Sequence, residues 1–273
     1  MSSRLKYLEG AVIGLGALAF TTARVAPAQH GTSSTSAVIA AFSAPRATSP
    51  DSGHHGTSAT AIASATQRAI AALGDAVRPL SSPHSLEDAF RSYFAFKTAH
   101  PEEVRKPYLY FVDYGLPSTA PRGYVFDMSS LEVLDGPFTV AHGRGSSESR
   151  YGVPTRFSND MGSEASSLGL YLTENAYHFL GRSAGRLYHS IGLRLVGVSG
   201  DYNDNAFSRR VVAHGAPYVT PTKAGRSEGC PAMELSRAQR LLPKLAEGGM
   251  VFLFAPDSDW LAGDPWVSAQ DGE

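Results

Sequence analysis

Short β-rich segments separated by turns make up most of the chain beyond residue 107. Each is rich in β-branched or aromatic residues and is bounded by Gly, Asn, Ser or Pro. Segments of this kind occupy residues 108–114, 123–128, 137–141, 168–173, 193–198, 210–214 and 250–255. The pattern predicts a mostly β fold with a minor α component (α+β minor).

Two other segments repeat their apolar residues at helical spacing. The first begins near Ser85, with Asp88 three residues later at the position of a capping box. The second begins at Ser236 and ends at the glycine pair 248–249, and we expect Pro243 to kink or shorten it. One or two peripheral helices should therefore accompany the β domain.

The first 28 residues have the pattern of a signal peptide. Arg4 and Lys6 precede the apolar stretch 11–20, and the small residues 26–28 form a cleavage site. Glu9 interrupts the pattern, and an uncleaved anchoring helix is the alternative. We expect export to the periplasm or cell envelope, with no stable membrane span after removal of the signal.

The composition changes after the predicted signal. Ala, Ser and Thr supply 27 of the 52 residues from 29 to 80. Such a segment has few large apolar groups to offset its ordering entropy, so residues 29–82 are predicted to form a disordered tether, with a helix as an alternative around 61–77. The predicted catalytic domain is then 83–260, and 261–273 are a predicted C-terminal tail.

Charge and cysteine content exclude several classes of protein. Lys and Arg total 24 against 25 Asp and Glu, and no basic run is present, so a nucleic-acid partner is not expected. The single cysteine, Cys230, excludes an internal disulfide and a multi-cysteine zinc site. No metal ion or other cofactor is predicted.

The residue types that carry chemistry gather between positions 210 and 233. An apolar strand leads to His214, and Cys230 follows sixteen residues later between Gly229 and Pro231. An unpaired thiol in an exported protein is exposed to oxidation unless the sulfur is used, which favours a nucleophile over a buried structural cysteine. His214 is the expected base that takes the thiol proton.

Neighbouring residues suggest supporting roles. Gly229 has no side chain and would let backbone N–H groups turn toward a developing oxyanion. Ser227 would donate a hydrogen bond to the substrate or cap the turn, and the sequence leaves both open. Arg226 would add a positive field near the thiol.

The pair His214-Gly215 followed by Ser227-x-Gly229-Cys230 resembles the active-site signature of L,D-transpeptidases (YkuD-like enzymes), in particular the murein L,D-transpeptidase catalytic domain family. The resemblance covers residues 106–256. It extends through the upstream blocks 140–146 (VAHGRGS), 157–159 (FSN), 166–171 (SSLGLY) and 193–198 (LRLVGV). It implies a barrel or sandwich catalytic domain with the active site at strand ends.

The family implies acyl transfer on peptidoglycan stem peptides: a thioester forms on Cys230, D-alanine leaves, and a neighbouring amine completes a 3-3 cross-link. An L,D-carboxypeptidase, which uses water instead, and a non-catalytic cell-wall-binding module are the alternatives. A zinc hydrolase using His142 and His214 lacks the usual ligand spacing. A monomer is expected.

The sequence departs from the family pattern after the cysteine. The widespread form has an arginine two residues after it, where this chain has Ala232, and Arg226 is the suggested replacement. Glu228 stands where some relatives carry a second histidine.

Five further residues are candidates for substrate binding. His142 ends an apolar strand as His214 does, and Asn159 offers an amide to a peptide backbone. Arg194, Arg209 and Arg210 would bind the carboxylate of the stem diamino acid. The alternatives are a turn histidine, ordinary turn chemistry for the asparagine and solvated strand edges for the arginines.

Overall fold

One mixed eight-stranded sheet organises the computed structural model, which describes residues 52–268. The strand order is β11-β7-β6-β5-β12-β1-β2-β3; the pairs β1–β12 and β7–β11 are parallel and the others are antiparallel. The strands are β1 (Tyr108–Asp113), β2 (Gly123–Asp127), β3 (Glu132–Phe138), β5 (Gly169–Ser183), β6 (Arg186–Gly197), β7 (Val212–Gly215), β11 (Ala232–Met233) and β12 (Met250–Phe254). Within the described residues β11 and β3 do not pair, so the mostly β prediction is confirmed but the sheet is open and no closed barrel forms.

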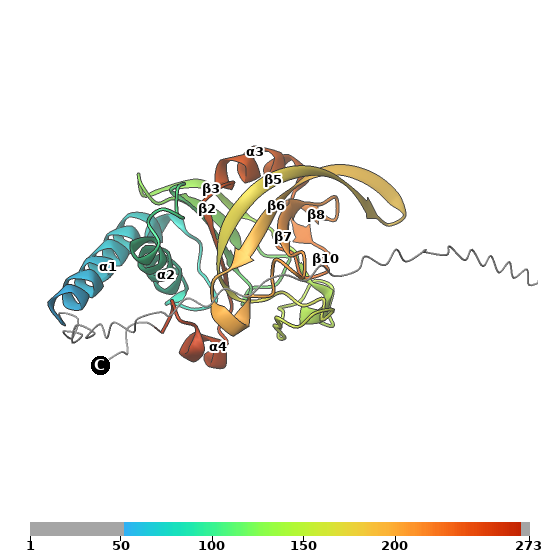
Figure 1. The fold of residues 1–273 in the computed structure, drawn as a ribbon. Helices are drawn as coiled ribbons and strands as arrows, with labels where there is room; N and C mark the ends of the chain where they lie inside the picture. Colours follow the sequence, from blue (N-terminus) through green and yellow to red (C-terminus); the bar gives the residue numbers. More distant parts are fainter. Residues whose placement is uncertain (1–51, 269–273) are drawn as a thin grey trace, which may run out of the picture. The chain divides into compact units, whose positions relative to one another are not determined.

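The core lies on both faces of the central strands β1 and β12. All five residues of β12 are buried, which requires cover on both sides of the sheet. On one face, the ring of Phe90 in α2 (Ser85–Ala99) packs edge-on against Phe126 at 5.3 Å, and Trp260 of α4 (Ser258–Gly263) contacts Phe252 at 5.8 Å. The helix α3 (Leu235–Leu245) packs against β5, β6 and β7 (Figure 1). These helices cover the sheet and bury its apolar side chains.

The structure differs from the predicted tether over residues 52–82. Helix α1 (Ser52–Leu73) packs against α2 and buries Ala69 and Leu73, and a 3-10 turn (Gly74–Ala76) follows it (Figure 1). The connection to α2 is also bound to the sheet, since Ser81 donates two hydrogen bonds to the carboxylate of Asp113. The helix expected as the alternative around 61–77 overlaps α1 and this turn, and small alanine and threonine side chains suit close helix packing. Residues 1–51, with the predicted signal and the rest of the tether, lie outside the described residues.

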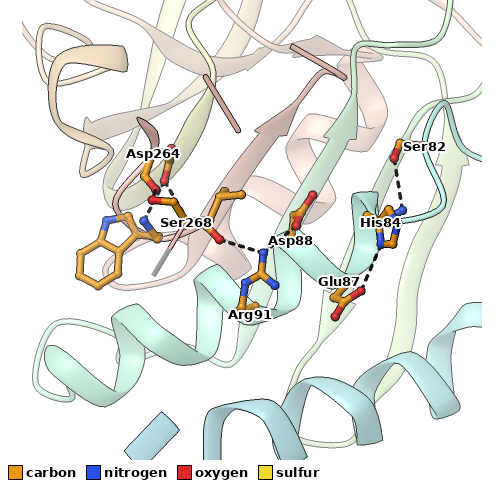
Figure 2. A network of polar contacts seen from close by, with 9 residues as sticks. Ser82, His84, Glu87, Asp88, Arg91, Asp264 and Ser268 are labelled. Carbon is orange, nitrogen blue, oxygen red and sulfur yellow. Dashed lines mark hydrogen bonds and ion pairs between the residues drawn. The ribbon is translucent and has the colours of Figure 1, made fainter. Parts of the chain in front are cut away.

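Part of the predicted C-terminal tail also packs on the domain. Arg91 of α2 donates one hydrogen bond to Asp88 and one to the carbonyl of Val267, both at 2.8 Å (Figure 2). Asp264 is fully buried and accepts a hydrogen bond from the Trp260 indole at 2.8 Å. The domain therefore extends beyond 260, at least to Ser268.

The predicted second helix is present with different ends. It begins one residue before Ser236, and its N-cap residue Glu234 makes no capping hydrogen bond through its side chain. Pro243 lies inside the helix, which ends two residues later at Leu245. The shortening is as expected, because proline cannot donate to the preceding turn.

The hairpin of β5 and β6 is far longer than the sequence predicted. Residues 174–192, expected as loops, continue both strands, and the hairpin arches away from the sheet (Figure 1). Four shorter strands form two small sheets beside it: β4 (His142–Gly143) with β10 (Arg226–Ser227), and β8 (Val219–Thr220) with β9 (Lys223–Ala224). No helix among residues 52–268 is both long and apolar enough to cross a membrane.

Candidate active site

Cys230 lies in a tight turn whose two ends are fixed by strand pairing. Before the turn, β10 pairs in parallel with β4, with Arg226 opposite His142. After the turn, β11 pairs in parallel with β7, with Ala232 opposite His214. The two short pairings therefore bring Cys230 to the end of the strand that carries His214, as the sequence predicted.

The turn is held by hydrogen bonds of its own residues. The Ser227 hydroxyl donates to the Cys230 carbonyl at 2.7 Å and accepts from the Gly229 N–H at 3.2 Å. Ser227 therefore caps the turn, and the Gly229 N–H is not available to an oxyanion. In the described part of the chain the Cys230 N–H makes no hydrogen bond, so this neighbouring donor remains free.

Glycine is required at position 229 by backbone geometry. Its φ of +119° lies in the region that L side chains rarely adopt, and a Cβ there would stand 2.9 Å from the carbonyl oxygen of Ala165. The loop containing Ala165 thus closes directly on the turn. The role of Gly229 is to permit this close approach beside the cysteine.

The sulfur of Cys230 is half-buried and contacts the backbone leading into β7. The Val212 N–H donates to Sγ at 3.5 Å, and Sγ is 4.0 Å from the carbonyl oxygen of Arg210. Burial raises the pKa of the Cys230 thiol, and the carboxylate of Glu228 raises it further, whereas the Val212 N–H and Arg209 lower it. The resting site therefore favours a protonated thiol.

His214 is nearly buried and held in one orientation. Its Nδ1 lies 3.0 Å from the carbonyl oxygen of Gly215, and a carbonyl only accepts, so Nδ1 carries the proton and Nε2 is left basic. The rings of Phe179 and Tyr218 stand edge-on to the imidazole at 5.9 and 6.5 Å. Burial lowers the pKa of His214, which keeps the ring neutral and able to accept a proton.

Cys230 and His214 line the same pocket, which has a volume of about 380 Å³. Its wall includes Arg226, whose guanidinium donates to the carbonyl of Ser147 at 2.9 Å and to that of Glu148 at 3.3 Å. The remaining lining residues are mostly polar or aromatic: Arg144, Arg182, Ser183, Tyr188, Tyr218, Ser227 and Glu228. The pocket can accept a polar peptide segment with anionic groups.

A second pocket of about 500 Å³ includes the backbone that contacts the sulfur. Arg194 and Arg210 line it together with Val212, whose N–H points to Sγ. Arg194 stacks over the ring of Tyr177 at 4.7 Å and donates to Asn175 at 3.1 Å. The two predicted arginines thus lie together, in a separate pocket from the one that contains Arg226.

His142 and Asn159 are not placed to bind substrate as predicted. His142 is fully buried, and Nη2 of Arg122 donates to its Nδ1 at 2.9 Å. Asn159 uses its amide to join two loops: its Nδ2 donates to the Asp201 carbonyl at 2.9 Å and to Asp204 at 2.6 Å. A strand end and a turn look alike in sequence whether they open to a cleft or are covered by another segment.

Three parts of the site were not predicted as such. Ser166 hydrogen-bonds the Gly229 carbonyl, Arg209 hydrogen-bonds the loop that closes on Gly229, and the β5–β6 hairpin brings Phe179 and Tyr188 over the cleft. The upstream block 166–171 and the arginine pair before β7 were visible in the sequence. Their roles depend on contacts between residues more than 40 positions apart.

Comparison with known proteins agrees with the family suggested by the sequence. The family model described as the L,D-transpeptidase catalytic domain matches residues 79–254. A search of curated proteins finds no match.

Three solved structures of low similarity are described as L,D-transpeptidases. An L,D-transpeptidase from Mycobacterium smegmatis is 14% identical, with 55% of this chain and 59% of that one covered and a TM-score of 0.33. The L,D-transpeptidase from Stackebrandtia nassauensis is 15% identical, with 63% of this chain and 67% of that one covered and a TM-score of 0.33. The one from Xylanimonas cellulosilytica is 12% identical, with coverage of 55% and 61% and a TM-score of 0.31.

The match thus spans only about three fifths of the Mycobacterium smegmatis chain. The family model, in contrast, covers most of the described domain, from the connection after α1 to the last residue of β12. The chain therefore belongs to the L,D-transpeptidase catalytic domain family.

Proposed function

We propose that this protein is a cysteine-dependent L,D-transpeptidase that acts on the stem peptides of peptidoglycan. The observation that carries the proposal is that His214 on β7 and Cys230, in the turn just before the paired strand β11, line one pocket. A nucleophile and a base that line one pocket, with the base oriented by a third group, form an arrangement suited to acyl transfer through a thiol. Here the orienting group is the Gly215 carbonyl.

The first half of the reaction would form a thioester. As Sγ of Cys230 attacks the carbonyl carbon of the third stem residue, the thiol proton passes to Nε2 of His214. The bond from that carbon to the nitrogen of D-alanine then breaks, and the imidazolium returns the proton to the leaving amine. The free Cys230 N–H is a suitable donor to the oxyanion formed on the way.

The second half would regenerate the thiol. An amine from another stem attacks the thioester carbon and loses a proton to His214, which passes it to the departing sulfur. The product is a 3-3 cross-link; with water as the acceptor, the same steps would make an L,D-carboxypeptidase. The pocket that contains Cys230, and a second pocket lined by the Arg210 and Val212 backbone that contacts its sulfur, support the use of two peptide substrates.

The low resting nucleophilicity of the thiol fits this scheme. Burial raises the pKa of Cys230 and lowers that of His214, so thiol and imidazole are both neutral before substrate binds. Proton transfer then accompanies attack and does not precede it. A neutral resting pair also exposes less thiolate to oxidants.

The activity is tested with purified full-length protein and muropeptides that carry tetrapeptide stems. Mass spectrometry should detect an acylated protein, free D-alanine and cross-linked dimers, none of them with Cys230→Ser. A stem ending in L-alanine is the matched substrate control and should not react. D-alanine without dimers would favour the carboxypeptidase, and neither product would overturn the proposal.

The base is tested separately from the substrate. Alkylation of Cys230 by iodoacetamide at neutral pH should be slower in His214→Ala than in the wild type, with His189→Ala, on the exposed face of the hairpin, as control. Equal rates in wild type and His214→Ala would contradict the proposed pairing.

We also propose that the protein is exported and works in the periplasm or cell envelope, where peptidoglycan is found. The support is the signal pattern of residues 1–28, which lies outside the described residues. Fractionation of cells that express the full chain should recover a product beginning after Ala28 outside the cytoplasm. A product retained in the cytoplasm with its first residues intact would contradict this.

A further inference from the structure

Arg209 forms an unusually dense set of hydrogen bonds next to the catalytic turn. Its guanidinium donates to the carbonyl oxygens of Ser158 and Ala165, both at 2.7 Å, and to the hydroxyls of Ser163 at 3.1 Å and Ser167 at 3.4 Å. All four acceptors are neutral. Among residues 52–268 no carboxylate forms an ion pair with Arg209, so its charge is not compensated by a contact.

The charged end of Arg209 lies against the backbone that precedes the nucleophile. A Cβ on Gly229 would stand 3.5 Å from Nη2 of Arg209 and 2.9 Å from the Ala165 oxygen that Arg209 binds. On the other side, Arg210, the next residue, contacts the sulfur of Cys230 through its carbonyl group. Arg209 thus joins the segment before β7 to the loop that closes on the turn, with Cys230 between them.

We propose that Arg209 is a positioning residue for Cys230: it fixes the two backbone segments around the turn and supplies the positive charge that favours the anionic sulfur. This deepens, and rests on, the proposed function. It replaces the expectation that Arg226 fills this role, since the hydrogen bonds of Arg226 go to the carbonyls of Ser147 and Glu148 and not to the two segments that flank Cys230.

The effect of Arg209 must be separated from that of other charged groups near Cys230. Glu228 raises the pKa of the thiol, and Arg209 lowers it. The other titratable groups that face the sulfur or line the adjoining pockets are His214, Tyr114, Tyr177, Tyr188, Tyr218, Arg144, Arg182, Arg194, Arg210 and Arg226. Asp160 and Tyr171 interact with Arg209 itself. A single substitution at 209 leaves all of them in place.

The test is the rate of Cys230 alkylation by iodoacetamide as a function of pH, measured on the full chain. In Arg209→Gln the midpoint of the curve should move up by about one pH unit, which is about a tenfold slower reaction at neutral pH. Arg209→Lys, which keeps the charge but cannot reach all four acceptors, should show an intermediate shift. Arg226→Gln and the exposed Arg186→Gln should keep the wild-type midpoint.

Circular dichroism and thermal melting establish that each variant is folded. An unchanged midpoint in folded Arg209→Gln would overturn the proposal, as would an equal shift in Arg226→Gln. If Arg209→Gln does not fold, an unchanged midpoint in Arg209→Lys overturns it. Because alkylation needs no peptidoglycan, this result stands whether or not the protein proves to be a transpeptidase.

Discussion

The hydroxyl of Ser166 donates a hydrogen bond to the carbonyl oxygen of Gly229 at 3.0 Å, one residue before Cys230. The same oxygen of Ser166 accepts a hydrogen bond from the Gly143 N–H, also at 3.0 Å. One buried side chain therefore joins the Cys230 turn to the strand β4 that runs beside it. The position of Cys230 depends on a residue 64 positions earlier in the chain.

Ser166→Ala should impair both stability and catalysis. It leaves a buried carbonyl and a buried N–H unpaired, which should cost about 1–3 kcal/mol of unfolding free energy. A displaced turn should also lower kcat by roughly 10- to 100-fold. Urea unfolding and muropeptide turnover measure the two effects, and the exposed Ser130→Ala is the control. Wild-type turnover in Ser166→Ala would mean that the turn holds its shape without this bond.

Acid should destabilise the domain through His142. Burial, and then the charge of Arg122, lower the pKa of His142 to about 3 in the folded protein, whereas an unfolded histidine has its ordinary pKa near 6.5. The unfolded state therefore binds more protons between these values. The contribution of neutral His142 to the stability of the folded domain is present above pH 6.5. This contribution is lost as the pH falls toward 3, by up to roughly 4 kcal/mol.

This dependence should be weaker in His142→Gln, whose side-chain oxygen can accept the hydrogen bond from Arg122. Chemical unfolding at a series of pH values from 7 to 4 gives the slope for each protein. His178→Gln, on the exposed face of the hairpin, should keep the wild-type slope. Equal slopes in all three proteins would show that His142 is not the group responsible.

The two faces of the β5–β6 hairpin should differ in their effect on turnover. The ring of Phe179 packs edge-on against that of His214 at 5.9 Å, whereas its neighbour Leu180 points the other way and is 55% exposed. Phe179→Ala should lower kcat/KM by roughly 10- to 100-fold, because His214 loses packing and the cleft loses its cover. Leu180→Ala should stay within about twofold of the wild type. Similar losses in both variants would contradict this arrangement of the hairpin.

The N-terminal helix should stabilise the domain without taking part in catalysis. Leu73 of α1 is 1% exposed and belongs to the main hydrophobic core. Leu73→Ala should lower the unfolding free energy by about 2–3 kcal/mol, with the kcat of the folded protein unchanged. Gln67→Ala, on the exposed side of α1, is the control for urea unfolding. No change in stability with Leu73→Ala would mean that this segment behaves as a tether and does not stabilise the domain.

The sequence predicted those features that depend on local pattern. The strands at 108–113, 123–127 and 250–254 were recognised from short apolar runs between turns, and the helix at 85–99 from its spacing. Cys230 and His214 were singled out because a lone cysteine between Gly and Pro is unusual and because their spacing matches a known signature. Both line one pocket, as expected.

The features that sequence could not provide depend on distant contacts. The hairpin strands were missed because residues 174–192 have mixed polarity, which suits a ribbon with one covered and one open face. In the sequence, His142 and Asn159 look like exposed polar residues. Their hydrogen-bond partners Arg122 and Asp204 are distant in the chain and become neighbours only through folding. The distance in sequence from Cys230 does not indicate which of Arg226 and Arg209 lies nearer to it in space, because the chain folds Arg209 onto the turn.

The position of β12 in the sheet has a consequence for synthesis of the enzyme. Among residues 52–268 this strand is the last, yet it lies between β1 and β5 and joins the two halves of the sheet. Until residue 254 is available, neither half has its neighbour, and a nascent chain or a truncated fragment lacks a continuous core. The domain should therefore mature only after nearly all of it has been made, so an incomplete copy should lack the formed pocket around Cys230.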